Sequence, residues 1–246
     1  MIELASYNYL ALSGIIILAM GALFVLEFLL NYFFNRLPEK NISLRIMTAK
    51  VVEILFSLFI LNLFGLLSRQ LFSLRRLNTG LIFLGMGLGL ALLVSYLSYS
   101  ALKTGRYGKK YSFILAKTPR DRFFTLITFV FLVGPAEDLF FIGFVQNILA
   151  VRLGWISVLI YLLLFTFFHY LNVLSGVEEN REFWVMLPIR LVISTILSVS
   201  FLLTGTIIYT LLIHNLFDTL NYLALLSARK IPEQKKREEW SDEEKN

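Results

Sequence analysis

Ionisable side chains occur inside stretches of this sequence that are otherwise apolar. The stretch GPAEDLFFIGFV at 134–145 places Glu137 and Asp138 next to each other, and each of the two histidines, His169 and His214, lies within a long apolar run. A buried carboxylate is suited to act as a general base, and an imidazole can hold water, donate a proton or stabilise an oxyanion. These residue types predict hydrolysis of an amide or peptide bond by an activated water.

The spacing of the polar residues indicates which of them act together. His214 and Asp218 are four residues apart, with Asn215 beside them. Because this spacing puts both on one face of a helix, we expect the Asp218 carboxylate to accept from a ring nitrogen and to fix its tautomer. Glu137 and Asp138 point about 100° apart on a helix, so we expect one to meet the reacting groups and the other to support it.

The same side chains are also suitable metal ligands. Glu137, His169 and His214 supply a carboxylate and two imidazoles, a set that can bind Zn²⁺ and leave a position open for water. The spacing alone is compatible both with a glutamate-activated water that needs no cofactor and with a zinc-dependent mechanism. The absence of cysteine excludes thiolate metal sites and a cysteine nucleophile.

The elements that must position these residues are membrane helices. Of the 246 residues, 57 % are hydrophobic and 16 % are charged, which is too apolar for a soluble domain of this length. Stretches of about 20 apolar residues are long enough to cross a bilayer as helices. We therefore expect an all-α, polytopic transmembrane helix bundle of about seven helices, within a range of six to eight. The stretches are 8–34, 51–67, 80–102, 123–149, 155–175, 184–204 and 206–226.

The distribution of basic residues predicts the topology. With the N-terminus outside, the cytoplasmic segments hold 18 Lys and Arg residues and the external ones hold 4, as the positive-inside rule requires. We expect a cell-membrane protein with a cytoplasmic C-terminus and three parts: N-terminal helices (about three) with a basic loop over 1–122, catalytic helices over 123–226 and a charged tail over 227–246. Since the basic residues lie in short loops, no nucleic-acid partner is expected.

Three of the ionisable residues share one depth in the membrane. Counted at 1.5 Å per residue, Glu137, His169 and His214 fall within about 6 Å of the bilayer centre. A charged side chain costs about 2.5–3.5 kcal/mol at this depth, so these groups must turn inward. Polar residues can also serve only to hold helices together. A common depth on three separate helices favours a single functional site instead.

Three short motifs carry a resemblance to a known family. EDLFFIG at 137–143, FTFFH at 165–169 and HNLFD at 214–218 are similar, in order and spacing, to the motifs EExxxR, FxxxH and HxxxN or HxxxD. Those motifs belong to the CAAX protease and bacteriocin-processing family of intramembrane endopeptidases, and the sequence most resembles its archaeal and eukaryotic branch of type 2 CAAX prenyl proteases. The resemblance covers roughly residues 120 to 226.

The resemblance implies a role for each matching residue. Glu137 corresponds to the glutamate that activates water, Phe165 and His169 to the second motif, and His214 with Asp218 to the third. Enzymes of that branch remove the last three residues after a prenylated cysteine. The expected partners are therefore membrane lipids and a peptide or lipidated-protein substrate.

The sequence departs from the first motif at two positions. Asp138 replaces the second glutamate, and Ile142 stands where the motif has arginine. A buried carboxylate without a neutralising partner is costly, and Arg190 on the sixth apolar stretch is one candidate to replace the missing cation. In the alternative interpretation, Arg190 extends to the membrane interface, as does Glu53 beside Lys50.

The polar residues are also compatible with two other classes of function. A catalytically silent relative that binds a lipid or peptide is compatible with the missing arginine. A proton or cation transporter would use the acids and histidines as a pathway. Inverted repeats or paired broken helices would favour the transporter, and the sequence contains neither.

Overall fold

The protein folds as a bundle of helices. The computed structural model describes residues 9–35, 42–103, 118–174 and 178–243, and the regular structure in these ranges is helical throughout. The predicted all-α bundle is therefore confirmed. The elements are α1 (Tyr9–Asn35), α2 (Ile42–Leu63), α3 (Leu77–Lys103), α5 (Pro119–Phe131), α6 (Val133–Asp138), the π-helix η3 (Leu139–Gln146), α7 (Asn147–Leu153), α8 (Ile156–His169), α9 (Leu171–Leu174), α10 (Asn180–Thr204) and α11 (Ile208–Glu243).

The described helices match most of the predicted spans. Five are long and apolar enough to cross a membrane, and the bent pair of α5 with α6–α7 makes a sixth if it counts as one span. The seventh predicted stretch forms the first part of α11, which does not meet the same criterion because His214, Asn215 and Asp218 lower its hydropathy. The chain is a multi-pass membrane protein.

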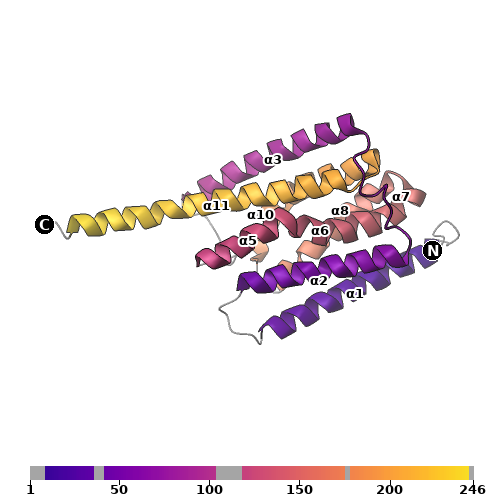
Figure 1. The fold of residues 1–246 in the computed structure, drawn as a ribbon, viewed down its shortest axis with the longest axis horizontal. Helices are drawn as coiled ribbons and strands as arrows, with labels where there is room; N and C mark the ends of the chain where they lie inside the picture. The colour runs from indigo at the N-terminus through magenta and orange to yellow at the C-terminus, as the bar shows by residue number, and fades with distance from the viewer. Residues whose placement is uncertain (1–8, 36–41, 104–117, 175–177, 244–246) are drawn as a thin grey trace.

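The packing of the helices places α6 between two long neighbours. In Figure 1, α11 runs through the bundle beside α3, and α1 lies on the outer side of α2. The helix α11 packs against α3, α5, α6 and α10, while α2 packs against α5, α6 and η3. The acids of α6 are consequently enclosed by α2 on one side and α11 on the other.

Helices α3 and α11 approach each other closely next to the second histidine. A Cβ atom on Gly87 would lie 2.5 Å from Cγ2 of Ile213, the residue before His214, so a larger residue at 87 would require the Ile213 side chain or the helix that carries it to shift. Small residues permit such close approach between membrane helices. Gly87 therefore helps to fix the position of His214.

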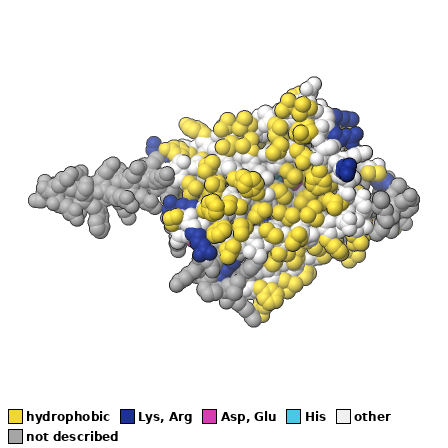
Figure 2. Space-filling model, in the orientation of Figure 1, with side chains coloured by type: hydrophobic (Ala, Val, Ile, Leu, Met, Phe, Trp, Pro, Cys, Tyr) yellow, Lys and Arg dark blue, Asp and Glu magenta, His cyan; other side chains and the backbone are white. Residues whose placement is uncertain are grey.

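The surface is that of a membrane-embedded bundle. Figure 2 shows hydrophobic side chains over the middle of one face and Lys and Arg side chains toward its ends. Large apolar side chains on several helices are well exposed, among them Ile17, Leu81, Leu159 and Val185. Apolar area of this extent is stable in contact with lipid tails rather than with water.

Two predicted boundaries differ from the structure. Helix α2 begins at Ile42 rather than at 51, which places Lys50 inside the helix rather than in a loop. The backbone of α11 continues as helix to Glu243, so the tail predicted over 227–246 extends the last helix. Most of the predicted basic loop lies at 104–117, outside the described residues.

Candidate active site

A break in the helix precedes the two acids. Helix α5 ends at Phe131, α6 begins at Val133, and the two directions differ by 45°. Pro135 has no N–H group, so the carbonyl of Phe131 loses the partner that a regular helix would give it. The kink thus lies where Pro135 removes a backbone hydrogen bond, and it directs the turn that carries Glu137 and Asp138 into the bundle.

A π-helix follows the acids. In η3 the backbone N–H of Asn147 donates to the carbonyl of Ile142, five residues earlier, and every side chain from Leu139 to Gln146 is buried. Ile142 is fully buried in the apolar core. The position at which the motif carries arginine is thus filled by an aliphatic side chain, and the cation near the acids has to come from another helix.

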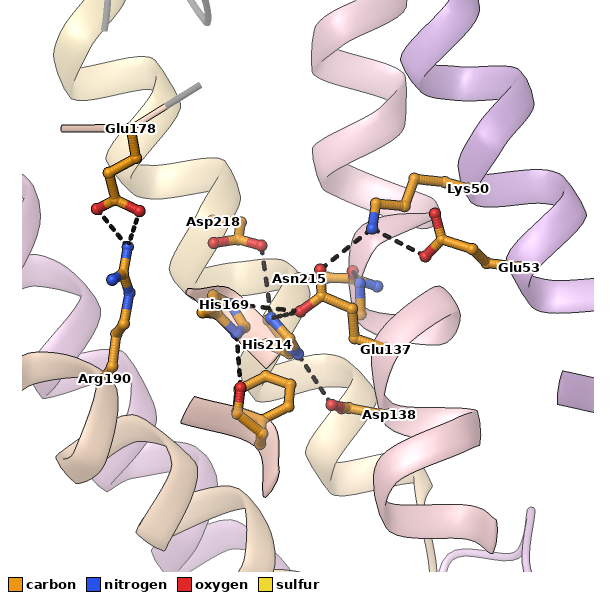
Figure 3. Close-up of polar contacts among 12 residues, drawn as sticks. Lys50, Glu53, Glu137, Asp138, His169, Glu178, Arg190, His214, Asn215 and Asp218 are labelled. Atoms are coloured by element: carbon orange, nitrogen blue, oxygen red, sulfur yellow. Dashed lines mark hydrogen bonds and ion pairs between the residues drawn. The ribbon is translucent and has the colours of Figure 1, made fainter. Parts of the chain in front are cut away.

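Glu137 uses its two carboxylate oxygens differently. Oε1 accepts a hydrogen bond from Nζ of Lys50 at 3.2 Å. Oε2 lies 3.7 Å from Nε2 of His169 and 3.8 Å from Nε2 of His214, distances that exceed a hydrogen bond. Oε2 is buried and has no hydrogen-bond partner among the described residues. Figure 3 shows Glu137 between the lysine and the two rings.

The acid that orients His214 is Asp138. Oδ1 of Asp138 lies 2.9 Å from Nδ1 of His214, and the Asp138 side chain is fully buried. The sequence predicted this role for Asp218, whose Oδ2 is 3.6 Å from Nε2 of His214, beyond hydrogen-bonding distance. That expectation was wrong about the partner, because spacing along one helix says nothing of a carboxylate that arrives from a neighbouring helix.

His169 is oriented by the backbone of its own helix. Its Nδ1 lies 3.0 Å from the carbonyl oxygen of Phe165. A carbonyl can only accept, so Nδ1 carries the hydrogen and Nε2 is left to face Glu137. The ring of Phe165 packs edge-on against His169 at 4.5 Å and against His214 at 6.2 Å, which fixes the two imidazoles relative to each other.

Asn215 joins α11 to α6. Its Oδ1 accepts a hydrogen bond of 2.9 Å from the backbone N–H of Gly134. A Cβ atom on Gly134 would lie 2.6 Å from that oxygen, so only glycine permits the contact without a shift. The predicted supporting residue Asn215 thus lies beside Glu137 in Figure 3, with its carbonyl group committed to the backbone of α6.

Lys50 and Glu53 join the polar cluster formed by Glu137, Asp138, His169 and His214, although the sequence did not predict that they would. Nζ of Lys50 lies 2.9 Å from Oε2 of Glu53 and bridges that carboxylate to Glu137. The Glu53 side chain is buried among the helices. The spacing of three residues between Lys50 and Glu53 is the signal in the sequence for their contact, because it puts both on one face of a helix.

Arg190 belongs to a different polar contact. One nitrogen of its guanidinium donates to both oxygens of Glu178, at 2.6 Å and 2.7 Å, and the group lies 4.9 Å from the ring centre of Phe183. Arg190 is buried among the helices. Figure 3 shows that Arg190 contacts Glu178 and not Glu137. Arg190 therefore does not replace the arginine that the motif has at position 142.

The side chains of Glu137, His169 and His214 are the candidate metal ligands of this site. Across the parts of the chain that the structure describes, no group of three or more His, Cys, Asp or Glu side chains is arranged to hold one. In addition, the ammonium of Lys50 is 3.2 Å from the Glu137 carboxylate and would repel a divalent cation bound there. Binding of zinc by Glu137, His169 and His214 stays a prediction, against which the position of the Lys50 ammonium argues.

The fold and the cluster define a polytopic membrane protein with a buried glutamate–histidine site. Residues 119–220 match the model of the family described as Type II CAAX prenyl endopeptidase Rce1-like. No curated protein and no solved structure matches the chain. The match agrees with the resemblance predicted from the three motifs: over residues 119–220 the chain is similar to the CAAX-type membrane endopeptidases. It spans all the clustered residues on α6, α8 and α11, whereas Lys50 and Glu53 lie outside it.

Proposed function

We propose that the protein is an intramembrane endopeptidase in which Glu137 activates the water that attacks a peptide bond. The observation that supports this most directly is the buried Oε2 of Glu137, which faces Nε2 of both histidines at 3.7 Å and 3.8 Å. Polar atoms separated by such distances are commonly bridged by water. A water at this point would contact the base and both imidazoles.

The proposed reaction follows from this placement. Oε2 of Glu137 takes a proton from the water while the water oxygen bonds to the carbonyl carbon of the substrate. Nε2 of His214, with the amide of Asn215 nearby, stabilises the oxyanion. The carbon–nitrogen bond then breaks, and the proton reaches the leaving amine through His169 or Glu137. The products are a carboxylic acid and an amine.

The substrate class follows from the family and the membrane location. A peptide segment held at the membrane, with a prenylated CAAX-type C-terminus as the first candidate, would reach a site enclosed by helices. We place this site toward the cytoplasm, with the N-terminus outside and the C-terminus cytoplasmic, on the asymmetry of 18 against 4 basic residues.

The apolar Ile142 supports a second candidate, a catalytically silent relative that binds a lipid or peptide. The arginine of the first motif is absent from this position, which is fully buried. If catalysis needed that arginine, the chain would retain a binding site without cleavage. The two candidates differ in whether any peptide is cut.

The decisive experiment is cleavage of fluorogenic peptides, prenylated and unmodified, by the detergent-purified protein. Glu137→Gln should abolish cleavage while Asp121→Asn, which replaces a carboxylate at the start of α5 in contact with Thr118, should not. A strong chelator should have no effect. Cleavage that is lost with chelator and restored by Zn²⁺ would overturn the glutamate mechanism. Binding of a peptide without cleavage would support the silent relative.

A further inference from the structure

A lysine on α2 contacts the glutamate of the candidate active site. The Lys50 side chain is 17 % exposed and extends from α2 into the bundle, where it meets Glu137 of α6. These two residues are 87 positions apart in the sequence, and the family match does not include Lys50. Figure 3 shows the ammonium between the carboxylates of Glu53 and Glu137.

The charges around Glu137 need a cation that the first motif does not provide. Glu137 is followed by the fully buried Asp138, and Ile142 is apolar. Arg190 is bound to Glu178 instead. Two neighbouring buried carboxylates repel each other, and an opposite charge at hydrogen-bonding distance offsets that repulsion.

The geometry of the contact separates the two oxygens of Glu137. Lys50 binds Oε1 at 3.2 Å, whereas both histidine nitrogens lie on the side of Oε2. A carboxylate that is held at one oxygen cannot rotate freely about its last torsion. The unbound oxygen is therefore directed toward the point at which the proposed water would lie.

We propose that Lys50 is a positioning residue that holds Glu137 by Oε1 and directs Oε2 at His169 and His214. In this role it supplies from α2 the positive charge that the first motif would supply from position 142. The inference rests on the proposed function of Glu137 as the base.

Glu53 has a distinct part in this arrangement. It lies one turn after Lys50 on the same helix and accepts a hydrogen bond of 2.9 Å from Nζ. An ammonium is a compact point charge on a flexible stem, so a second carboxylate restricts where it can lie. Glu53 thus anchors the lysine, and its removal should weaken the contact with Glu137 without abolishing it.

The test compares Lys50→Met, Lys50→Arg and Glu53→Gln in the peptide cleavage assay, with Lys103→Met as the matched control at the exposed end of α3. Lys50→Met should lower kcat about 10- to 100-fold with KM changed less than about threefold, as expected when a reacting group is displaced. Lys50→Arg should restore most of kcat, and Glu53→Gln should cost less than Lys50→Met. A Lys50→Met enzyme as active as the parent would overturn the inference, as would a Glu53→Gln loss equal to that of Lys50→Met.

A second measurement does not depend on cleavage. The thermal unfolding midpoints of the parent, Lys50→Met, Glu137→Gln and the double variant form a cycle, measured in the same detergent. If Lys50 and Glu137 are paired, the two single shifts are not additive. Additive shifts would overturn the pairing even if no substrate were cut.

The two hypotheses fail in different ways. Cleavage that persists in Glu137→Gln contradicts the proposed function itself. Cleavage that is abolished in Glu137→Gln but unchanged in Lys50→Met contradicts only the inference about the lysine.

Discussion

Nδ1 of His214 on α11 lies 2.9 Å from Oδ1 of Asp138 on α6. The two adjacent acids of α6 thus contact different nitrogens of His214. Asp138 binds Nδ1, and Glu137 faces Nε2. A histidine whose Nδ1 is bound to a carboxylate presents Nε2 in a defined direction. The pair couples the first and third motifs through a hydrogen bond between helices.

Replacing Asp138 should impair catalysis more than replacing Asp218. Asp138→Asn leaves a side chain of the same shape but offers an amide that can select the wrong tautomer of His214, so we expect kcat to fall about 100-fold, within the range of acid–base effects. Asp218→Asn should cost about 2- to 10-fold, because its contact of 3.6 Å is too long for a full hydrogen bond. Steady-state kinetics on the two purified variants decide this, and a larger effect of Asp218→Asn would show that the Asp138 contact is unimportant.

The contact between Arg190 and Glu178 should matter most for stability when one of the two charges is removed and the other stays buried. Arg190→Met removes both hydrogen bonds that the guanidinium donates to the buried Glu178 carboxylate and should lower the free energy of unfolding by about 3–5 kcal/mol. The double variant Arg190→Met/Glu178→Leu should recover most of this loss, because neither charge then remains. Unfolding of the protein in mixed micelles with increasing denaturing detergent measures both. A double variant as unstable as the single one would contradict this account.

The junction of α6 and α11 should not tolerate a methyl group. Gly134→Ala places a Cβ 2.6 Å from Oδ1 of Asn215 and should cost about 1–3 kcal/mol as overpacking. Cleavage should fall as well, since Glu137 lies on the same turn. Gly89→Ala is the matched control, because its Cβ meets nothing within 4 Å, and it should leave the melting temperature unchanged or slightly raised. Equal melting temperatures for the two variants would argue against this contact.

The proposed orientation can be tested directly because the chain contains no cysteine. Single cysteines at Asn78 and Ser227, which are exposed positions, should be labelled by a membrane-impermeant maleimide from opposite sides. We expect Asn78→Cys to react on intact cells and Ser227→Cys to react only after permeabilisation. The reverse pattern would mean that the N-terminus is cytoplasmic.

The motif residues explain why part of the site was predictable. His169, His214 and Glu137 each lie in a distinct apolar run at similar depth, and equal depth was enough to predict that they would meet. The break at Pro135 was also predictable, because a proline without an N–H group disrupts a helix wherever it occurs. The fold class followed from the number and length of the apolar runs.

Other contacts depend on how helices rotate against each other. The spacing of His214 and Asp218 predicted a partner on the same helix, but the orientation of α6 brings Asp138 closer. The charge of Lys50 predicts a loop before the apolar run, whereas the backbone is already helical from Ile42 and the Lys50 ammonium binds two carboxylates inside the bundle. Partners on different helices leave no periodic trace in a single sequence.

The π-helix after the acids lets the chain carry one residue more than a regular helix would. In η3 the backbone hydrogen bond spans five residues rather than four. In a regular α-helix an extra residue would rotate everything before it by about 100° relative to everything after it. The wider turn takes up that residue, so Glu137 on one side keeps its direction toward the imidazoles while α7 on the other side keeps its packing against α8. The irregular geometry of this turn, as well as its amino acids, is therefore part of what specifies the site.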